Sequence, residues 1–244
     1  LESLIVVAHN PTLVRNAIRS ERHAELAEHS PDRISYYITA ANRGQRSAMV
    51  AFRQLREHCA PPVVALVGIA GGIHRELNLG DVVVSTEVVY YDMRKETAAG
   101  VQRRGQSQQA PPVIGRKINA FFTRHGEPLR LADPHGTRES FQVVRGPIGS
   151  GEAVVAHQAS EIRHYLECFN NKVLAVETEI GGVAQEVYEE LDQDRSLAGW
   201  LTVRGISDLA DAMKDDAYHG IAARHAAETL MLLLPFLPIS EGPA

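Results

Sequence analysis

Two carboxylates stand shortly after apolar, strand-like segments of the sequence. Glu179 follows residues 173–176, and Asp208 follows residues 201–203. Ligands of a parallel sheet bind beyond the carboxyl ends of its strands, so both side chains are candidates for a site. The two acceptor oxygens of one carboxylate suit a vicinal diol such as that of ribose. A partly buried aspartate can hold a proton at neutral pH and act as a general acid.

Both carboxylates also have purely structural interpretations. Glu179 stands in the first turn of a predicted helix, where an acidic residue can simply interact with the helix dipole. Asp208 can be a helix N-cap. Taken singly, neither position decides between structure and chemistry.

Two glycine-rich stretches follow other predicted strands. Residues 68–73 come after the strand at 63–67, and residues 145–152 come after the strand near Val143. Both stretches are predicted to be turns, in which missing side chains let backbone amides approach a ligand. Close packing is the alternative, because neither stretch matches a dinucleotide-binding fingerprint or a P-loop.

The elements that would position these residues alternate between strands and helices. Apolar, β-rich runs predict strands at 4–7, 34–39, 63–67, 82–84, 142–145, 173–176 and 201–203. Helical periodicity predicts helices at 11–19, 47–59, 117–125, 161–168, 179–191 and 216–234. This alternation indicates βαβ units and an α/β fold with a mostly parallel sheet. Residues 98–115 are predicted to form a long loop, either a lid over a pocket or a surface excursion.

Composition narrows the class of protein. A chain of 244 residues with 44% hydrophobic and 23% charged residues predicts one globular domain over residues 1–244. The net charge of -5 argues against nucleic acid or an anionic membrane as partner. The two cysteines, Cys59 and Cys168, fit a reducing compartment, so we expect a cytoplasmic protein. Neither has metal-like spacing with histidine, so we expect no metal, and we expect no cofactor. The sequence shows neither an apolar run of membrane-spanning length nor a signal peptide, and it starts at Leu1, which suggests excision from a longer, multidomain chain.

Several motifs together resemble those of the purine nucleoside phosphorylase superfamily. The resemblance is closest to its hydrolytic branch, the methylthioadenosine/adenosylhomocysteine nucleosidases. The motifs occur in the family's order at residues 68–72, 79–85, 150–153, 176–179 and 203–211. The resemblance implies a three-layer fold with a central mixed, mostly parallel sheet flanked by helices.

The same resemblance implies roles for particular residues. Asp208 would protonate the purine at N7 as the glycosidic bond breaks, and Glu179 would bind the ribose 2′- and 3′-hydroxyls. The remaining substrate-binding candidates are Ala70, Gly71, Val154, Val155, Glu177, Thr178, Ser207, Arg43 and His9.

Departures from the family pattern favour hydrolysis over phosphorolysis. Leu66 stands where phosphorylases usually place a phosphate-binding arginine, and the N-terminal Gly-Asp-Pro motif is missing. Hydrolytic relatives carry a water-activating glutamate after the first strand, whereas this chain has Ala8, His9 and Asn10. His9 or Asn10 would then orient the water, although Asn10 before Pro11 is also a good helix start.

Basic residues leave the 5′ substituent of the substrate open. Arg43 lies in a strand-to-helix turn and could hold a phosphate or be solvated, and the same alternatives apply to Arg94, Lys95, Arg103 and Arg104. The pattern at 215–223 resembles domains of multidomain signalling and immune proteins, which suggests antiviral defence and an adenine nucleotide such as ATP as substrate.

Relatives are commonly dimers, trimers or hexamers, so a homo-oligomer is expected. Two alternatives remain: a phosphorolytic enzyme and a non-catalytic nucleotide-sensing domain.

Overall fold

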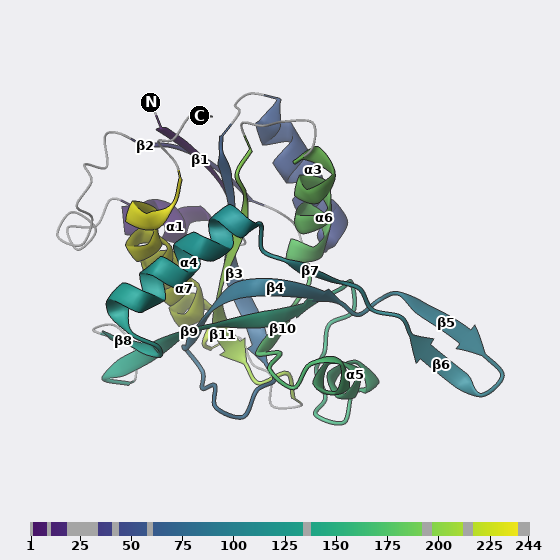
Figure 1. Ribbon diagram of the computed structural model, residues 1–244. Helices are drawn as coiled ribbons and strands as arrows, with labels where there is room; N and C mark the ends of the chain where they lie inside the picture. The colour runs from purple at the N-terminus through teal and green to yellow at the C-terminus, as the bar shows by residue number, and fades with distance from the viewer. Residues whose placement is uncertain are drawn as a thin grey trace.

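A mixed sheet of nine strands runs through the molecule, with helices on both faces (Figure 1). The structure is a computed structural model that describes residues 2–8, 11–18, 34–40, 44–57, 61–133, 138–191, 197–211 and 217–238. The strands of the sheet are β1 (Glu2–Ala8), β2 (Ile34–Ala40), β3 (Val63–Gly72), β4 (Val82–Tyr90), β7 (Ser107–Gln109), β8 (Leu129–Ala132), β9 (Ser140–Ser150), β10 (Ala175–Glu177) and β11 (Gly199–Asp208). The helices are α1 (Pro11–Ile18), α3 (Gln45–Arg56), α4 (Pro112–His125), α5 (Glu161–Phe169), α6 (Ile180–Glu190), α7 (His219–Leu233) and the short 3-10 helix η2 (Leu234–Phe236). The predicted fold class, α/β with a mixed and mostly parallel sheet flanked by helices, is confirmed.

The short strand β10 closes part of the sheet into a ring. The main strand order is β10-β9-β4-β11-β3-β1-β2, and β10 pairs in addition with β3. Val176 of β10 lies opposite Gly71 of β3 in an antiparallel pair, while β10 runs parallel to β9. The five strands β10, β9, β4, β11 and β3 therefore form a closed hydrogen-bonded circuit.

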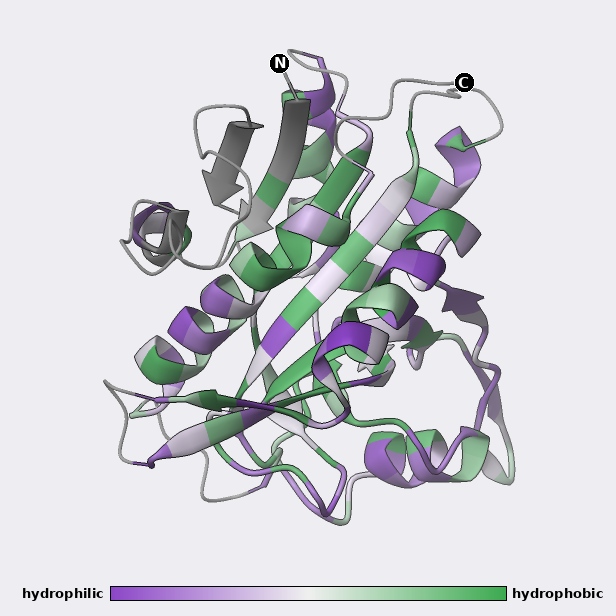
Figure 2. Ribbon diagram, turned by 60° about the vertical axis from the view of Figure 1, so that its left-hand side comes forward, coloured by the Kyte–Doolittle hydropathy of each residue, from purple (hydrophilic) through white to green (hydrophobic). Residues whose placement is uncertain are grey.

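Two hydrophobic cores fill the opposite faces of the sheet. Helices α1, α4 and α7 cover one face, where Phe121 is fully buried, and α3 and α6 cover the other, where Trp200 is buried (Figure 1). Figure 2 shows helices striped with hydrophobic and hydrophilic residues, whereas hydrophobic residues predominate along the central strands. This is the pattern expected for a sheet that is covered on both faces. Within the described residues, no helix has the length and apolarity needed to cross a membrane.

The glycine-rich stretches predicted as turns are in fact strand ends. β3 continues through Gly72, and β9 continues through Ser150. A Cβ added at Gly146 would lie 2.6 Å from Leu174 Cδ1, and one at Gly149 would lie 2.6 Å from Leu166 Cδ1. Glycine is needed at these two positions because the leucine side chains pack directly against the strand backbone, and not because the chain turns there.

The prediction of a long loop at 98–115 is also wrong. Most of this stretch is regular structure, namely β6 (Gly100–Arg103), β7 and the start of α4. β6 pairs with β5 (Arg94–Thr97) in an antiparallel hairpin that projects from the body of the molecule (Figure 1). β7 pairs with β4 at the edge of the sheet. The segment is a projecting hairpin followed by an edge strand, and not a lid.

Candidate functional site

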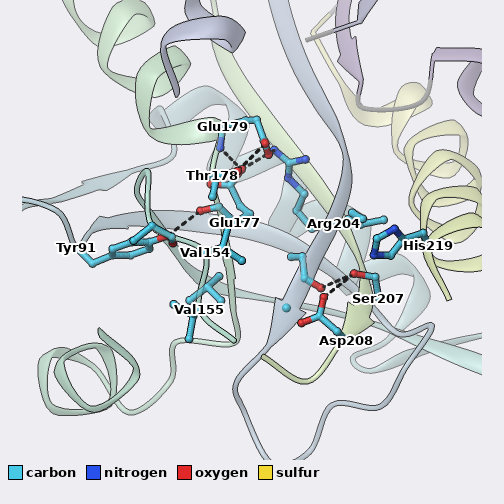
Figure 3. A pocket seen from close by; sticks show the side chains of 15 residues that line it. Tyr91, Val154, Val155, Glu177, Thr178, Glu179, Arg204, Ser207, Asp208 and His219 are labelled. Atoms are coloured by element: carbon cyan, nitrogen blue, oxygen red, sulfur yellow. Dashed lines mark hydrogen bonds and ion pairs between the residues drawn. The ribbon is translucent and has the colours of Figure 1, made fainter. Parts of the chain in front are cut away.

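A pocket lies where β10 meets the ends of β3 and β11 (Figure 3). Gly71 of β3 connects the two walls, because it pairs with Val176 of β10 on one side and with Asp208 of β11 on the other. The pocket is lined by Ile69, Ala70, Gly71, Tyr91, Ala153, Val154, Val155, Val176, Glu177, Thr178, Glu179, Arg204, Ser207, Asp208 and His219. Closure of the sheet thus brings together residues that are distant in the chain, such as Glu177 and Arg204, which are 27 residues apart.

Asp208 reaches the pocket through an irregularity in β11. The pairing register with β3 shifts between Ile206 and Asp208, so that Ser207 is the extra residue of a bulge. The Asp208 carboxylate is buried and accepts hydrogen bonds from Ser207 Oγ at 3.0 Å and from the Ala210 backbone N at 2.9 Å. Asp208 is therefore the end of a strand with a fixed carboxylate. It is not the N-cap of a helix within the described residues.

Gly71 leaves the space that the Asp208 carboxylate occupies. A Cβ added at Gly71 would lie 2.9 Å from Asp208 Oδ1 and 3.1 Å from Ala210 Cβ. Such contacts are shorter than van der Waals distance, so a side chain there would displace the carboxylate. Glycine at this position is thus a requirement of the site.

Glu177 and Arg204 form a buried ion pair in the wall of the pocket. Arg204 Nη2 lies 2.6 Å from Glu177 Oε2, and both side chains are almost fully buried. The same Glu177 oxygen accepts hydrogen bonds from the backbone N–H groups of Glu179 and Ile180, each at 2.9 Å, at the start of α6. Burial raises the pKa of the Glu177 carboxyl above its ordinary value, and the Arg204 guanidinium opposes that shift. Glu177 thereby fixes the first turn of α6 and, with it, the backbone of Glu179.

Glu179 points its carboxylate toward the pocket. Its Oε1 accepts a hydrogen bond from Thr178 Oγ1 at 2.7 Å, and its Oε2 lies 3.4 Å from Arg204 Nη2. The side chain remains 15% exposed, in contrast to Glu177 at 1%. Glu179 occupies the N-cap position of α6 without a side-chain capping bond, so capping does not explain its carboxylate.

The segment after β9 supplies an apolar wall. Val155 is buried, whereas Val154 is 54% exposed at the rim of the pocket. Ala70 and Val176 add further apolar surface from β3 and β10. The pocket therefore combines an apolar side with carboxylates at two separate places, Asp208 and Glu179.

The structure brings most of the predicted site residues together. Pocket residues that the sequence had identified are Ala70, Gly71, Val154, Val155, Glu177, Thr178, Glu179, Ser207 and Asp208. His9, Asn10 and Arg43 lie outside the described residues. Leu66 is buried in the core beneath α3 and α6.

Sequence reasoning missed three polar residues of the pocket. They are Tyr91, Arg204 and His219, the last of which begins α7 (Figure 3). A charged residue directly after the apolar run 201–203 was an available sign for Arg204, because a buried charge needs a partner. The basic residues of the hairpin region, Arg94, Lys95, Arg103 and Arg104, are not among the residues that line the pocket. Within the described part of the chain, no cluster of three or more His, Cys, Asp or Glu side chains could hold a metal ion.

Comparison with known proteins identifies the family. The profile of the phosphorylase superfamily matches residues 38–237. The chain belongs to this superfamily. A relative from Haemophilus ducreyi, a 5′-methylthioadenosine/S-adenosylhomocysteine nucleosidase, is 31% identical over 196 residues, which cover 78% of this chain and 76% of the relative.

Solved structures of nucleosidases and of a futalosine hydrolase share the fold. The Neisseria meningitidis 5′-methylthioadenosine/S-adenosylhomocysteine nucleosidase, in complex with methylthio-immucillin-A, superposes with a TM-score of 0.69 at 22% identity, over 97% of this chain and 100% of that one. A futalosine hydrolase mutant from Helicobacter pylori superposes with a TM-score of 0.71 at 14% identity, over 97% of this chain and 100% of that one. These solved structures confirm the fold, and the relative that is 31% identical confirms the predicted class of enzyme, an N-ribosyl hydrolase of the purine nucleosidase type.

Proposed function

We propose that this superfamily member hydrolyses the N-glycosidic bond of an adenine nucleoside, with Asp208 as general acid and Glu179 as the ribose-binding carboxylate. One observation carries the proposal: a fixed Asp208 and a pocket-facing Glu179 lie in the same pocket, beside an apolar wall. Adenine is the base we propose because the Haemophilus ducreyi relative is a nucleosidase of adenine-containing compounds by name.

Asp208 is suited to the base side of the reaction. Cleavage of the bond between ribose and purine leaves electrons on the base, and a proton delivered to N7 neutralises them. The backbone N of Ala210 and the hydroxyl of Ser207 hold the carboxyl group from two directions. A proton held on Asp208 would therefore be offered from a fixed position, which lowers the reorganisation needed in the transition state.

Glu179 is suited to the sugar side. Two acceptor oxygens can receive both vicinal hydroxyls of ribose, and the carboxylate charge would favour the positive charge that develops on the sugar ring. Thr178 Oγ1 and Arg204 Nη2 lie beside the two oxygens and limit how the carboxylate can rotate. The purine would then lie against Val154 and Val155, between the two carboxylates.

Water is the proposed acceptor of the ribosyl group, in preference to phosphate. The position where phosphorylases carry a phosphate-binding arginine holds Leu66, a residue of the core. His9 or Asn10 after β1 is the proposed partner of the water, in the place of the glutamate of hydrolytic relatives.

A nucleoside is favoured over a nucleotide by the charge of the described pocket. Three carboxylates line it, and Arg204 is paired with Glu177 and lies close to Glu179. The alternative substrate, ATP in antiviral defence, is suggested by the sequence pattern at 215–223 and by Arg43. The comparison of substrates includes ATP for this reason. A cytoplasmic homo-oligomer is proposed on the same resemblance.

The proposal is tested by chromatography of the base released from adenosine, inosine, methylthioadenosine, AMP and ATP, each with and without phosphate. We expect phosphate-independent release of adenine, faster from the two uncharged adenine nucleosides than from AMP or ATP. Release that requires phosphate and yields ribose 1-phosphate would identify a phosphorylase. Tight binding of a substrate without release of base would contradict the enzyme and indicate a sensing domain.

A further inference from the structure

Tyr91 directly follows β4 and lies beside the segment that forms the apolar wall of the pocket. The side chain is 1% exposed, and its hydroxyl lies among three backbone carbonyl oxygens, those of Ala153 at 2.7 Å, Gly151 at 3.2 Å and Glu177 at 3.3 Å. Two of these carbonyls belong to the segment 151–155, and the third belongs to β10. One phenol thus connects the apolar wall to the strand that precedes Glu179 (Figure 3).

The neighbouring residue holds the same segment from a second direction. Asp92 Oδ2 accepts a hydrogen bond from the Glu152 backbone N at 2.5 Å. In addition, the Tyr91 backbone N donates to Ser150 O at 3.2 Å. Tyr91 and Asp92 therefore fix consecutive peptide groups just before Val154 and Val155.

The Tyr91 ring also determines how closely the segment approaches. A Cβ added at Gly151 would lie 2.3 Å from Tyr91 Cε2 and 2.7 Å from Asp92 Oδ1. Without the hydroxyl, Ala153 O would lose the donor that lies 2.7 Å from it beside a buried ring, which is costly because a buried acceptor has no water to replace that donor. Burial raises the pKa of the Tyr91 hydroxyl, so the group remains a donor over the whole neutral range.

We infer that Tyr91, with Asp92, is a positioning residue that holds the segment 151–155 at the distance from Asp208 needed to bind a purine base. This inference rests on the proposed function, since it assigns the base to the Val154 and Val155 wall. Tyr91 touches the wall through the backbone and does not take part in the chemistry. Its loss therefore weakens binding of the base more than it slows bond cleavage.

The test compares Tyr91→Phe with Tyr90→Phe, a matched control. Tyr90 is the preceding residue of β4, and its hydroxyl bonds to Gln108 Oε1 at 2.9 Å and Gly181 O at 3.1 Å, away from segment 151–155. Adenine affinity is measured by calorimetry, and amide hydrogen exchange is followed in peptides that cover 151–155. We expect Tyr91→Phe to weaken adenine binding roughly tenfold, the scale of one buried hydrogen bond, to raise KM more than it lowers kcat, and to speed exchange in 151–155. Tyr90→Phe should do none of these.

Wild-type adenine affinity and exchange in Tyr91→Phe would overturn the inference while leaving the proposed function intact. If the wild-type protein neither binds adenine nor releases base, the proposed function fails, and the assignment of this wall to a purine fails with it. Exchange in segment 151–155 then shows separately whether Tyr91 holds the segment. Should Tyr91→Phe not fold, Asp92→Ala removes the other attachment and is expected to act in the same direction.

Discussion

Asp208 owes its position to two small residues, one beside it in β11 and one across from it in β3. Ser207 forms the bulge that turns the end of β11, and its hydroxyl bonds to the Asp208 carboxylate. Gly71 leaves room for that carboxylate on the paired strand. The bulge at Ser207 and the absence of a side chain at Gly71 thus determine where the Asp208 carboxylate lies.

Replacement of Asp208 tests the acid directly. Asp208→Asn keeps the size of the side chain but removes the acidic proton, so kcat is expected to fall by roughly 10²- to 10⁴-fold, the usual contribution of a general acid. The measurement is adenine release at saturating adenosine. Asp211→Asn, a change of the same kind at a residue that does not line the pocket, should leave kcat close to wild type. An Asp208→Asn enzyme as fast as the Asp211→Asn enzyme would contradict the role of Asp208.

Gly71→Ala tests whether the space around the carboxylate matters. The added methyl would displace Asp208 Oδ1, and a misplacement of about 1 Å can cost roughly 10²-fold in rate. Gly72→Ala is the matched control, since its Cβ would lie 3.0 Å from Ile206 Cγ2 instead of touching the Asp208 carboxylate. We expect both variants to lose about 1–3 kcal/mol of unfolding free energy from overpacking, and only Gly71→Ala to lose rate. Equal rates in the two variants would show that the carboxylate tolerates displacement.

At the scale of elements, the end of β4 and the residue after it supply two tyrosines that make different contacts, Tyr90 and Tyr91. The Tyr91 hydroxyl attaches the pocket segment, and the Tyr90 hydroxyl attaches β7 and the first turn of α6 through Gln108 and Gly181. Both phenols are at least partly buried, and burial raises the pKa of Tyr90 to about 12. The strand thereby connects the edge of the sheet to the pocket.

Tyr90 makes stability fall at alkaline pH. Because the pKa of Tyr90 is about 12 in the folded protein and near 10 when the chain unfolds, unfolding releases a proton between pH 10 and pH 12. The contribution is fully present below pH 10 and declines as pH rises toward 12. Urea unfolding at pH 9 and pH 11 should therefore show a smaller alkaline loss in Tyr90→Phe than in the wild type. Some loss should persist, because the pKa of Tyr91 is also raised by burial. The same loss in both proteins would mean that Tyr90 is not protected from ionisation.

The limits of sequence prediction are clearest in the lengths of the strands. The alternation of β-rich and helical segments predicted the fold class, and the ordered motifs predicted which side chains share a pocket. The glycine-rich pattern predicts a turn at Gly146 and Gly149, but both residues lie in β9, where Leu174 and Leu166 pack against them. The sequence also does not predict the ion pair between Arg204 and Glu177, because that contact depends on the pairing of β10 with β3. Local patterns cannot show a contact that only the topology creates.

At the scale of the whole molecule, the sheet separates two cores that support one pocket. Phe121 of α4 is fully buried on one face, with its ring 5.1 Å from that of Phe122 and 5.4 Å from that of Phe236. Trp200, the single tryptophan of the chain, is buried on the other face. β11, which carries Asp208 at its end, lies between the two cores.

Phe121→Ala tests whether the two cores unfold together. The loss of a buried aromatic ring is expected to lower the unfolding free energy by about 3–5 kcal/mol. Trp200 fluorescence during urea denaturation reports the opposite face, so a lower midpoint with an unchanged slope would show one cooperative unit. An unchanged Trp200 transition, alongside earlier loss of helical circular dichroism, would show that the faces unfold separately.

The ring of strands closed by β10 has a consequence for how the enzyme can move. A closed circuit of hydrogen bonds has no edge along which two halves could hinge apart. Asp208 at the end of β11 and Glu179 after β10 are therefore attached to one closed frame, which resists a change in their separation. Motion is left to segments outside the ring, and among them the stretch after β9 is restrained by its hydrogen bonds to Tyr91 and Asp92. The spacing of the two carboxylates is thus set by the pairing of β10 with β3.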